Sequence, residues 1–268
     1  MLEVIRKIDE VARDCEADYF LAGATAREIL LRHVFGAGPG PGTLDVDFAI
    51  AVRDWNHFRQ FKSALCGRAN FEAHSKKAQR LIHKPSGIAV DLIPFGGVQD
   101  ADGIIAWPPE EDIVMRVTGF KEALASSALV RLDQGLVIRV VSLPALMVLK
   151  LFAWADRKYE RRDAGDIYAI LRQYGDAGNE NRLYGSEVHL LESEGFDFEA
   201  AGARLLGRDA ARLVSPETRR KVEDILSSPQ QMRELTNQII SASRHHDAGQ
   251  ARRCELLLSK MTASFLDA

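Results

Sequence analysis

The chain has 268 residues, which is enough for one large domain or two modest domains with a complete hydrophobic core. Its hydrophobic content of 46% and charged content of 27% are ordinary for a globular protein and exclude disorder along the whole chain. The formal net charge of -3 excludes the strongly basic class of nucleic-acid coat proteins, so a nucleic-acid substrate would need a local basic patch.

The N-terminal region predicts a helix, a strand and a second helix. An amphipathic pattern favours a helix from about Leu2 to Glu16, and the apolar stretch Tyr19–Ala22 predicts a strand that ends in a tight turn at Gly23. A helix is expected to follow over residues 24–35. Its apolar residues at helical spacing are Ile29, Leu30, Val34 and Phe35.

The glycine- and proline-rich segment 36–42 breaks the chain before a second strand over residues 44–52. Side chains alternate between the two faces of a strand, so this strand has an apolar face and an acidic face. The apolar face carries Leu44, Val46, Phe48 and Ile50. The other face carries Asp45, Asp47 and Ala49.

The rest of the first half continues as mixed helix and strand. Residues 54–67 predict a helix with Asp54 as its N-cap. Three short strands spaced like a meander, a short helix and a further strand are then expected. Their ranges are 71–75, 78–84, 87–96, 121–129 and 136–143.

After Pro144 the pattern becomes helical. Helices are predicted over residues 145–159, 163–175, 198–207, 216–228 and from Gln230 to the end. The expected fold is therefore α+β, with an α/β core over residues 1–143 and a helical part over residues 144–268.

The three cysteines, Cys15, Cys66 and Cys254, lie far apart and have no C-x-x-C spacing, so neither a disulfide framework nor a structural zinc site is expected. Acidic residues run through the first 17 residues, which lack the apolar region of a signal peptide. No apolar run approaches the roughly 18 residues of a membrane span. We expect a cytoplasmic protein without membrane contact.

Asp45 and Asp47 are two residues apart on a predicted strand, so their carboxylates leave the same face. Aspartate is depleted in strands, and two close carboxylates repel each other unless a cation lies between them. Mg²⁺ prefers such hard oxygen ligands and completes its shell with water and substrate phosphates. A metal site is the favoured interpretation, and an exposed strand face is the alternative.

Asp91 is the single acid in the apolar run Ile88–Pro94. A lone buried aspartate is costly unless it is paired or bound to metal. If its strand is adjacent to the first acidic strand, three carboxylates can hold two metal ions about 4 Å apart, as a two-metal mechanism requires. The alternative is an aspartate that caps a turn at the end of a loop.

The turn at Gly23 offers a phosphate contact, because a residue without a side chain lets backbone N–H groups approach and a helix N-terminus follows. Thr25 can donate its hydroxyl there. Arg27 could reach a phosphate or pair with an acid. The alternative is a simple strand-to-helix turn.

On the helical side, Lys150 lies among apolar residues, so its ammonium group is expected to extend into a cleft and bind a triphosphate. Asp163 and Asp166 are one turn apart and could orient Lys150 or a hydroxyl nucleophile. A structural salt bridge between Lys150 and either aspartate is the alternative. The basic run Arg157–Arg162 is a candidate contact for RNA phosphates, or else a solvated turn between helices.

The stretches LAGATAREILL (residues 21–31) and TLDVDFAI (residues 43–50) resemble the DNA polymerase β-type nucleotidyltransferase superfamily and are similar to the head of tRNA CCA-adding enzymes. Gly23-Ala24 stands where Gly-Gly or Gly-Ser is usual, so a phosphate contact at Ala24 would come from the backbone alone. Residues 140–171 resemble the AbiEii-type group of that superfamily.

The resemblance implies a polymerase β-like core of a small mixed sheet flanked by helices, followed by a helical part. It implies two Mg²⁺ ions, for which Mn²⁺ can substitute, held by Asp45, Asp47 and Asp91. The resemblance also implies that Lys150 and either Asp163 or Asp166 complete the site. The residues expected to bind the nucleotide are Gly23, Ala24, Thr25, Arg27 and Lys150.

The implied activity is the transfer of an NMP unit from an NTP to a hydroxyl acceptor on RNA, such as a tRNA 3′ end, or on a protein. The AbiEii-type group further implies a toxin neutralised by a separate antitoxin protein. Two alternatives stay open: a nucleotidyltransferase acting on a small molecule such as an aminoglycoside, and a non-catalytic nucleotide-binding module.

Overall fold

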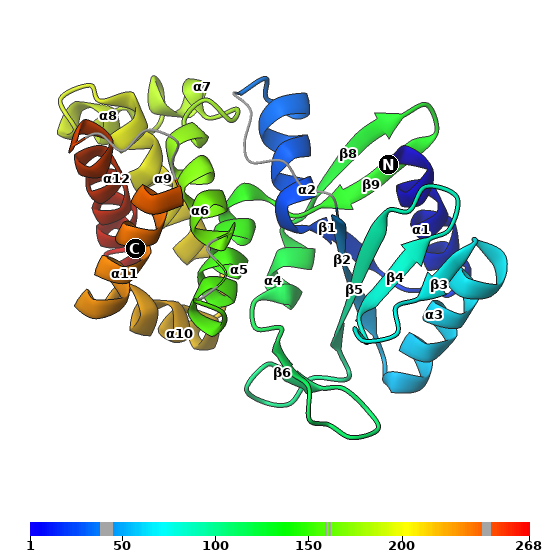
Figure 1. Ribbon diagram of the computed structural model, residues 1–268. Coiled ribbons are helices and arrows are strands. Elements are labelled where there is room, and N and C mark those ends of the chain that lie inside the picture. Colours follow the sequence, from blue (N-terminus) through cyan, green and yellow to red (C-terminus); the bar gives the residue numbers. More distant parts are fainter. Residues whose placement is uncertain (38–44, 159, 161, 243–247) are drawn as a thin grey trace. The chain divides into compact units, whose positions relative to one another are not determined.

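The structure is a computed structural model that describes residues 1–37, 45–158, 160, 162–242 and 248–268 (Figure 1). Contacts divide the chain into two compact units. The first is Met1–Ala26 with Gly42–Ser142, and the second is Arg27–Pro41 with Leu143–Ala268. The division into domains at residues 143 and 144 stays a prediction. No sequence pattern indicated that Arg27–Pro41 belongs with the helical unit.

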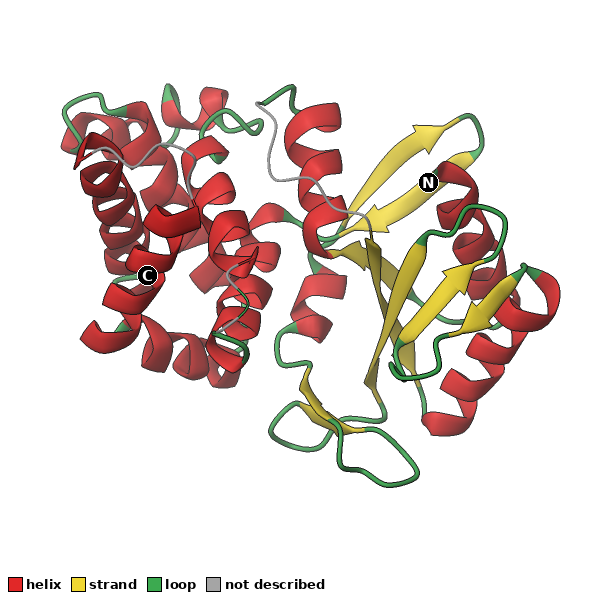
Figure 2. Cartoon of the chain, viewed as in Figure 1, coloured by secondary structure: helices red, strands yellow, loops and turns green. Residues whose placement is uncertain are grey.

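A seven-stranded mixed sheet forms the centre of the first unit (Figure 2). The strand order is β3-β4-β5-β2-β1-β9-β8. The strands are β1 (Tyr19–Ala22), β2 (Asp45–Val52), β3 (Phe71–Ala73), β4 (Arg80–His83), β5 (Ala89–Gly96), β8 (Ala128–Asp133) and β9 (Leu136–Val140). A separate two-stranded sheet pairs β6 (Ile104–Ala106) with β7 (Val114–Arg116). The predicted α+β fold is confirmed.

The predicted meander is confirmed by β3, β4 and β5, which pair antiparallel in chain order. The next neighbour of β5 is β2, which runs parallel to it. Strand β2 also pairs antiparallel with β1. The strand that carries Asp91 therefore lies directly beside the strand that carries Asp45 and Asp47, as the three-carboxylate hypothesis requires.

Two helices lie beside each other on one face of the sheet, α1 (Leu2–Asp14) and α3 (Trp55–Arg68) (Figure 1). The Asp54 side chain accepts a hydrogen bond from the His57 backbone at 2.8 Å, which confirms the predicted N-cap of α3. Helix α1 ends two residues before the predicted Glu16, because Glu16 has a left-handed backbone with a φ of 53°.

An aromatic cluster covers part of the other face of the sheet. Phe20 of β1, Phe95 of β5 and Phe120 of α4 (Phe120–Ala125) have ring centroids 5.7 to 5.9 Å apart. Phe20 pairs with Ala49, so the cluster shares its face with the acidic side of β2. The acidic residues therefore border a buried apolar cluster rather than an entirely solvated surface.

The second unit is helical among its described residues. Its helices are α5 (Leu143–Asp156), α6 (Arg162–Gln173), α7 (Glu180–Leu183), α8 (Val188–Ser193), α9 (Phe198–Leu213), α10 (Pro216–Leu226), α11 (Pro229–Ala242) and α12 (Ala248–Leu266). Helix α5 is buried on nearly all sides, as its apolar sequence requires. Asp197 and Ser215 cap α9 and α10. Of the helices described, none combines the length and apolar character that crossing a bilayer needs.

Several local predictions were incomplete or wrong. Helix α2 (Gly23–Glu28) continues as a π-helix over Ile29–Val34 instead of remaining α-helical to residue 35. The extra residue in the π turn rotates the apolar face, so Leu30 and Leu31 are buried while Val34 and Phe35 are exposed. The strands β6, β7 and β8 and the helices α7 and α8 were missed. Leu44, residues 38–42 and residues 243–247 lie outside the described chain.

Helix α9 packs closely on α12 at Gly207. A Cβ at this position would collide with the backbone carbonyl of Met261, which belongs to α12 and cannot move aside like a side chain. Gly207→Ala is therefore expected to lower the free energy of unfolding by about 1–3 kcal/mol. Chemical denaturation followed by circular dichroism measures this loss.

Gly67→Ala is the matched control, because Gly67 is also helical but a Cβ there meets nothing within 4 Å. Alanine has the higher helix propensity, so this control is expected to keep or slightly raise stability, by up to about 1 kcal/mol. Equal denaturation midpoints for the Gly207 variant and the wild type would show that the helices can separate without cost.

Candidate active site

Asp45 and Asp47 lie on one face of β2, as the alternation of the sequence predicts. Both are half-buried, whereas Val46 and Phe48 between and after them are fully buried on the opposite face. The local reason is the period of two residues in a strand, which turns the large apolar side chains toward the core. The two carboxylates are therefore held in place by the packing of their neighbours.

Asp91 joins the two aspartates through the register of the sheet. It is the direct partner of Asp47 across the parallel pair β5–β2, so the two side chains leave the same face as neighbours. Asp91 lies inside β5, and the alternative of an aspartate at a loop end is wrong. Like charges directly opposite each other destabilise a sheet, so this arrangement calls for a cation.

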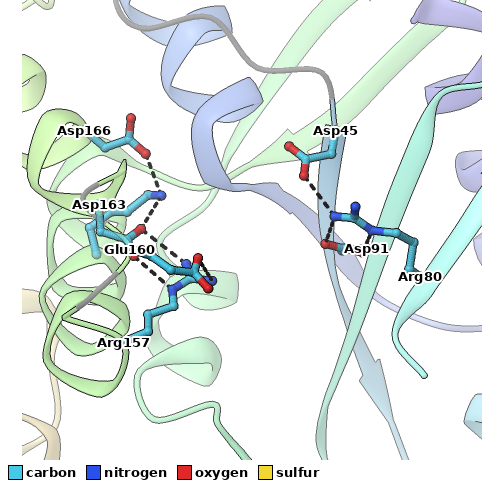
Figure 3. A network of polar contacts seen from close by, with 8 residues as sticks. Asp45, Arg80, Asp91, Arg157, Glu160, Asp163 and Asp166 are labelled. Atoms are coloured by element: carbon cyan, nitrogen blue, oxygen red, sulfur yellow. Dashed lines mark hydrogen bonds and ion pairs between the residues drawn. The ribbon is translucent and has the colours of Figure 1, made fainter. Parts of the chain in front are cut away.

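Arg80 supplies one such cation and was not singled out by the sequence (Figure 3). It is the partner of Asp91 on β4 and donates Nε to Oδ1 at 2.7 Å and Nη2 to Oδ2 at 2.6 Å. Its Nη2 also donates to Asp45 Oδ2 at 2.9 Å. The hydrogen bonds to Asp91 raise the pKa of the Arg80 guanidinium above its ordinary value. We call Arg80, Asp91, Asp47 and Asp45 the carboxylate row.

Gly23 closes the row at the end of β1. Gly23 lies beside Asp47, because the preceding residue, Ala22, pairs with Asp47 across β1 and β2. A Cβ at Gly23 would collide with the Asp47 carboxylate, and Gly23 has a left-handed backbone with a φ of 67°. The absence of a side chain at Gly23 thus makes room for Asp47. The role of Gly23 and Ala24 in phosphate binding stays a prediction.

Gly23→Ala is expected to displace the Asp47 carboxylate and to reduce nucleotidyl transfer, while the sheet stays folded. Gly87→Ala is a closely matched control, because Gly87 has the same φ of 67° but a Cβ there meets nothing within 4 Å. Both variants carry the backbone strain of about 1–2 kcal/mol for a left-handed alanine. Transfer rates and melting curves of both variants separate the displacement of Asp47 from the backbone strain. Equal transfer rates for the two variants would show that Gly23 has no special role.

Thr25 and Arg27 are both buried and engaged within the protein. The Thr25 hydroxyl donates to the Asp45 carbonyl at 2.9 Å, which fixes the start of β2. Arg27 forms an ion pair with Asp166 within the second unit. Of the two roles predicted for Arg27, the pair with an acid is the one observed. Nucleotide binding by Thr25 or Arg27 stays a prediction.

A second polar cluster lies within the helical unit, on α5 and α6. Lys150 Nζ lies 2.8 Å from Asp163 Oδ1 and 2.6 Å from Asp166 Oδ2. Arg157 Nε donates to Asp163 Oδ2 at 2.9 Å. The alternative offered by the sequence, a salt bridge from Lys150, is therefore observed with both aspartates, and triphosphate binding by Lys150 stays a prediction. We call Arg27, Lys150, Arg157, Asp163 and Asp166 the helical-unit cluster.

Apart from the half-exposed Arg157, the helical-unit cluster is more deeply buried than the carboxylate row. Asp163 and Asp166 are 1% and 4% exposed and Lys150 is 8% exposed. Each buried charge has an opposite partner, which offsets much of the desolvation cost. Its buried groups are balanced in charge, since Arg27 and Lys150 face Asp163 and Asp166, while the half-exposed Arg157 also lies 4.0 Å from Glu160.

The residues of the carboxylate row fit a divalent cation in their chemistry. Three half-buried carboxylates offer hard oxygen donors. The Asp47 carboxylate occupies the space that a side chain at Gly23 would need. Within the described residues, no three acidic, histidine or cysteine side chains already surround one point as a ready metal cage. Arg80, hydrogen-bonded to Asp45 and Asp91, occupies part of that space.

Comparison with known families shows the family to which the chain is related. Residues 42–248 match the family described as "Nucleotidyl transferase AbiEii toxin, Type IV TA system". The chain belongs to the AbiEii nucleotidyltransferase family. The matched span includes the predicted site residues Asp45, Asp47, Asp91, Lys150, Asp163 and Asp166. Gly23, Ala24, Thr25 and Arg27 precede it.

Solved structures of nucleotidyltransferases are similar to this chain at low identity. The antibiotic-resistance factor ANT(2'')-Ia has 14% identity and a TM-score of 0.39, over 71% of this chain and 94% of that one. A nucleotidyltransferase-like protein from Paracoccidioides brasiliensis has 15% identity and a TM-score of 0.41, over 75% and 91%.

The Thermotoga maritima CCA-adding enzyme complexed with tRNA has 12% identity and a TM-score of 0.25, over 99% of this chain and 81% of that one. A search of curated proteins gives no match. Membership of the AbiEii nucleotidyltransferase family therefore follows from the family match.

Proposed function

We propose that this chain is a Mg²⁺-dependent nucleotidyltransferase that moves an NMP unit from an NTP to a hydroxyl acceptor. The observation that carries the proposal is the carboxylate row, in which Asp47 and Asp91 are direct neighbours and Asp45 lies on the same face. Membership of the AbiEii nucleotidyltransferase family supports the same activity.

In the proposed reaction, the acceptor hydroxyl releases its proton to solvent and its oxygen bonds to the α-phosphorus of the NTP. The bond from that phosphorus to the oxygen that bridges to the β-phosphate breaks, and pyrophosphate leaves. Bound divalent cations would neutralise the phosphates and lower the pKa of the attacking hydroxyl. Asp45, Asp47 and Asp91 would hold these cations through their carboxylate oxygens. Their half-buried places on a rigid sheet keep the carboxylates oriented before substrate arrives.

The proposed role of the helical-unit cluster is to hold the negative charge of the triphosphate. Lys150 is already oriented by two aspartates, so little side-chain freedom is lost when it binds an anion. Asp163 and Asp166 would act as positioning residues that hold the ammonium group in place.

We propose RNA as the acceptor. We also propose a separate antitoxin protein as the partner, as the family description suggests. The described basic residues of the run that the sequence offered for RNA contact are Arg157, Lys158 and Arg162. Arg157 is partly engaged with Asp163, and Lys158 with Glu234. The proposed compartment is the cytoplasm, where NTPs are supplied.

The test is incubation of the purified chain with each α-labelled NTP, Mg²⁺ or Mn²⁺, and total RNA, with an EDTA arm. Metal-dependent label in RNA is the expected result. Label in the protein itself would indicate self-modification, and label in an added aminoglycoside would move the acceptor to a small molecule. Absence of label with every NTP, metal and acceptor would overturn the proposal in favour of a non-catalytic nucleotide-binding module.

A further inference from the structure

Arg80 is placed to compete with a divalent cation for the carboxylate row. Two of its nitrogens bind both oxygens of Asp91, at 2.7 and 2.6 Å, in the parallel geometry that a guanidinium and a carboxylate favour. The same Nη2 reaches Asp45 Oδ2 at 2.9 Å. A cation that used the Asp91 oxygens as ligands would therefore have to displace two hydrogen bonds from Arg80.

The register of the sheet fixes the contact between Arg80 and Asp91. Arg80 and Asp91 are direct partners across the antiparallel pair β4–β5, and Asp91 and Asp47 are direct partners across β5–β2. The Arg80 side chain is only 18% exposed and that of Asp91 only 14%. Water therefore screens their attraction less than it screens a pair on the open surface.

We propose that Arg80 is an internal cation that takes the place of one of two divalent ions in the carboxylate row. Without nucleotide, the row then binds one divalent ion readily, through Asp45 and Asp47. A second ion binds at Asp91 only when it displaces the guanidinium. This inference rests on the proposed function, because it takes the row as the metal site.

The charge of the row supports one ion rather than two. Three carboxylates and one guanidinium carry a formal charge of minus two, which a single divalent cation balances. Because arginine stays protonated at all working pH values, its charge cannot be lost by titration. Arg80 therefore weakens the binding of a second ion until the NTP phosphates add further negative charge.

The experiment measures Mn²⁺ binding to the full-length chain without nucleotide, by electron paramagnetic resonance of the free ion. The wild type is expected to bind one ion, and Arg80→Met is expected to bind two. The second site of this variant should be about tenfold to a hundredfold tighter than any second site of the wild type. Arg80→Lys should fall between them, because an ammonium group cannot span both oxygens of Asp91.

Arg68→Met is the matched control, since Arg68 also pairs with an aspartate of the first unit, Asp14, but at an exposed place. It is expected to bind Mn²⁺ as the wild type does. Equal Mn²⁺ stoichiometry and affinity in the wild type and Arg80→Met would overturn the role of Arg80 and leave the metal site standing. If Arg80→Met fails to fold, equal Mn²⁺ affinity in Arg80→Lys and the wild type overturns it.

A different result separates the proposed function from this inference. If neither the wild type nor a folded Arg80→Met binds Mn²⁺ at millimolar concentration, the carboxylate row is not a metal site. In that case the metal-dependent mechanism fails, and the inference fails with it. Circular dichroism spectra of all variants show which of them are folded.

Discussion

Asp47→Asn is expected to lower nucleotidyl transfer by about a thousandfold or more without lowering the stability of the fold. An amide is a poorer ligand for Mg²⁺ than a carboxylate. The transition state then loses several kcal/mol of charge stabilisation, and each loss of roughly 1.4 kcal/mol lowers the rate tenfold. Stability is expected to hold or rise, because Asp47 faces Asp91 directly and the substitution removes a like-charge repulsion. Transfer of labelled NMP and thermal melting of the same samples measure both effects.

Asp14→Asn provides the comparison for this loss. Asp14 is an exposed carboxylate of the same unit that pairs with Arg68, and exposed pairs contribute little to stability. Its variant is expected to retain the wild-type rate. Equal rates for the Asp47 and Asp14 variants would remove Asp47 from the site, and a large fall in melting temperature of the Asp47 variant would point to a structural role instead.

Asp166→Asn is expected to lower the free energy of unfolding by about 3–5 kcal/mol, the usual cost of breaking a buried ion pair from one side. Asp166 pairs with Arg27, which is fully buried, and with Lys150 at 2.6 Å. The amide keeps the shape of the side chain but removes its charge, so both cations lose a counterion away from water. Denaturant unfolding of the full chain, followed by circular dichroism, measures the loss.

Glu160→Gln is the control for the helical-unit cluster. Glu160 lies 4.0 Å from Arg157 and its side chain is 58% exposed, so its removal is expected to change stability by less than about 0.5 kcal/mol (Figure 3). An Asp166 variant that is as stable as the Glu160 variant would mean that the buried cations find other partners. It would also mean that the cluster does not stabilise the helical unit.

The strands and helices that carry the site could be predicted from the period of their apolar residues. The alternation around Asp45 and Asp47 predicted β2, and the apolar run around Lys150 predicted α5. These patterns are local, since they depend only on which face of one element is buried. The elements that were missed, such as β6 and β7 at three residues each, are too short to establish a period.

The register between strands could not be predicted in the same way. Nothing in the sequence of β4 distinguishes Arg80 from an exposed arginine on a strand, and its contacts depend on the order β4-β5-β2. That order places β2 beside a strand that is not its neighbour in the chain. The hypothesis that Asp91 joins Asp45 and Asp47 depended on this pairing, which only the three-dimensional structure could supply.

The helical-unit cluster shows a similar limit. A lysine on one helix and two aspartates on the next could be predicted to pair, since they are close in the chain and on facing turns. The pair of Arg27 with Asp166 could not, because 139 positions separate the two residues. For Arg27, which lies one turn after Gly23, the sequence predicted a phosphate contact or a pair with an acid, but it could not identify the acid.

The pairing of Arg27 with Asp166 makes the helical unit discontinuous in sequence. The polypeptide enters this unit first at Arg27, leaves it again, and returns at Leu143. A fragment that begins at Leu143 would retain Asp166 and Lys150 but lose the buried guanidinium that accompanies them. A fragment that ends at Ser142 would carry that guanidinium without its carboxylate. Cutting the chain between Ser142 and Leu143 would therefore divide an ion pair. Neither fragment is then a natural unit for expression, domain exchange or split-protein assembly.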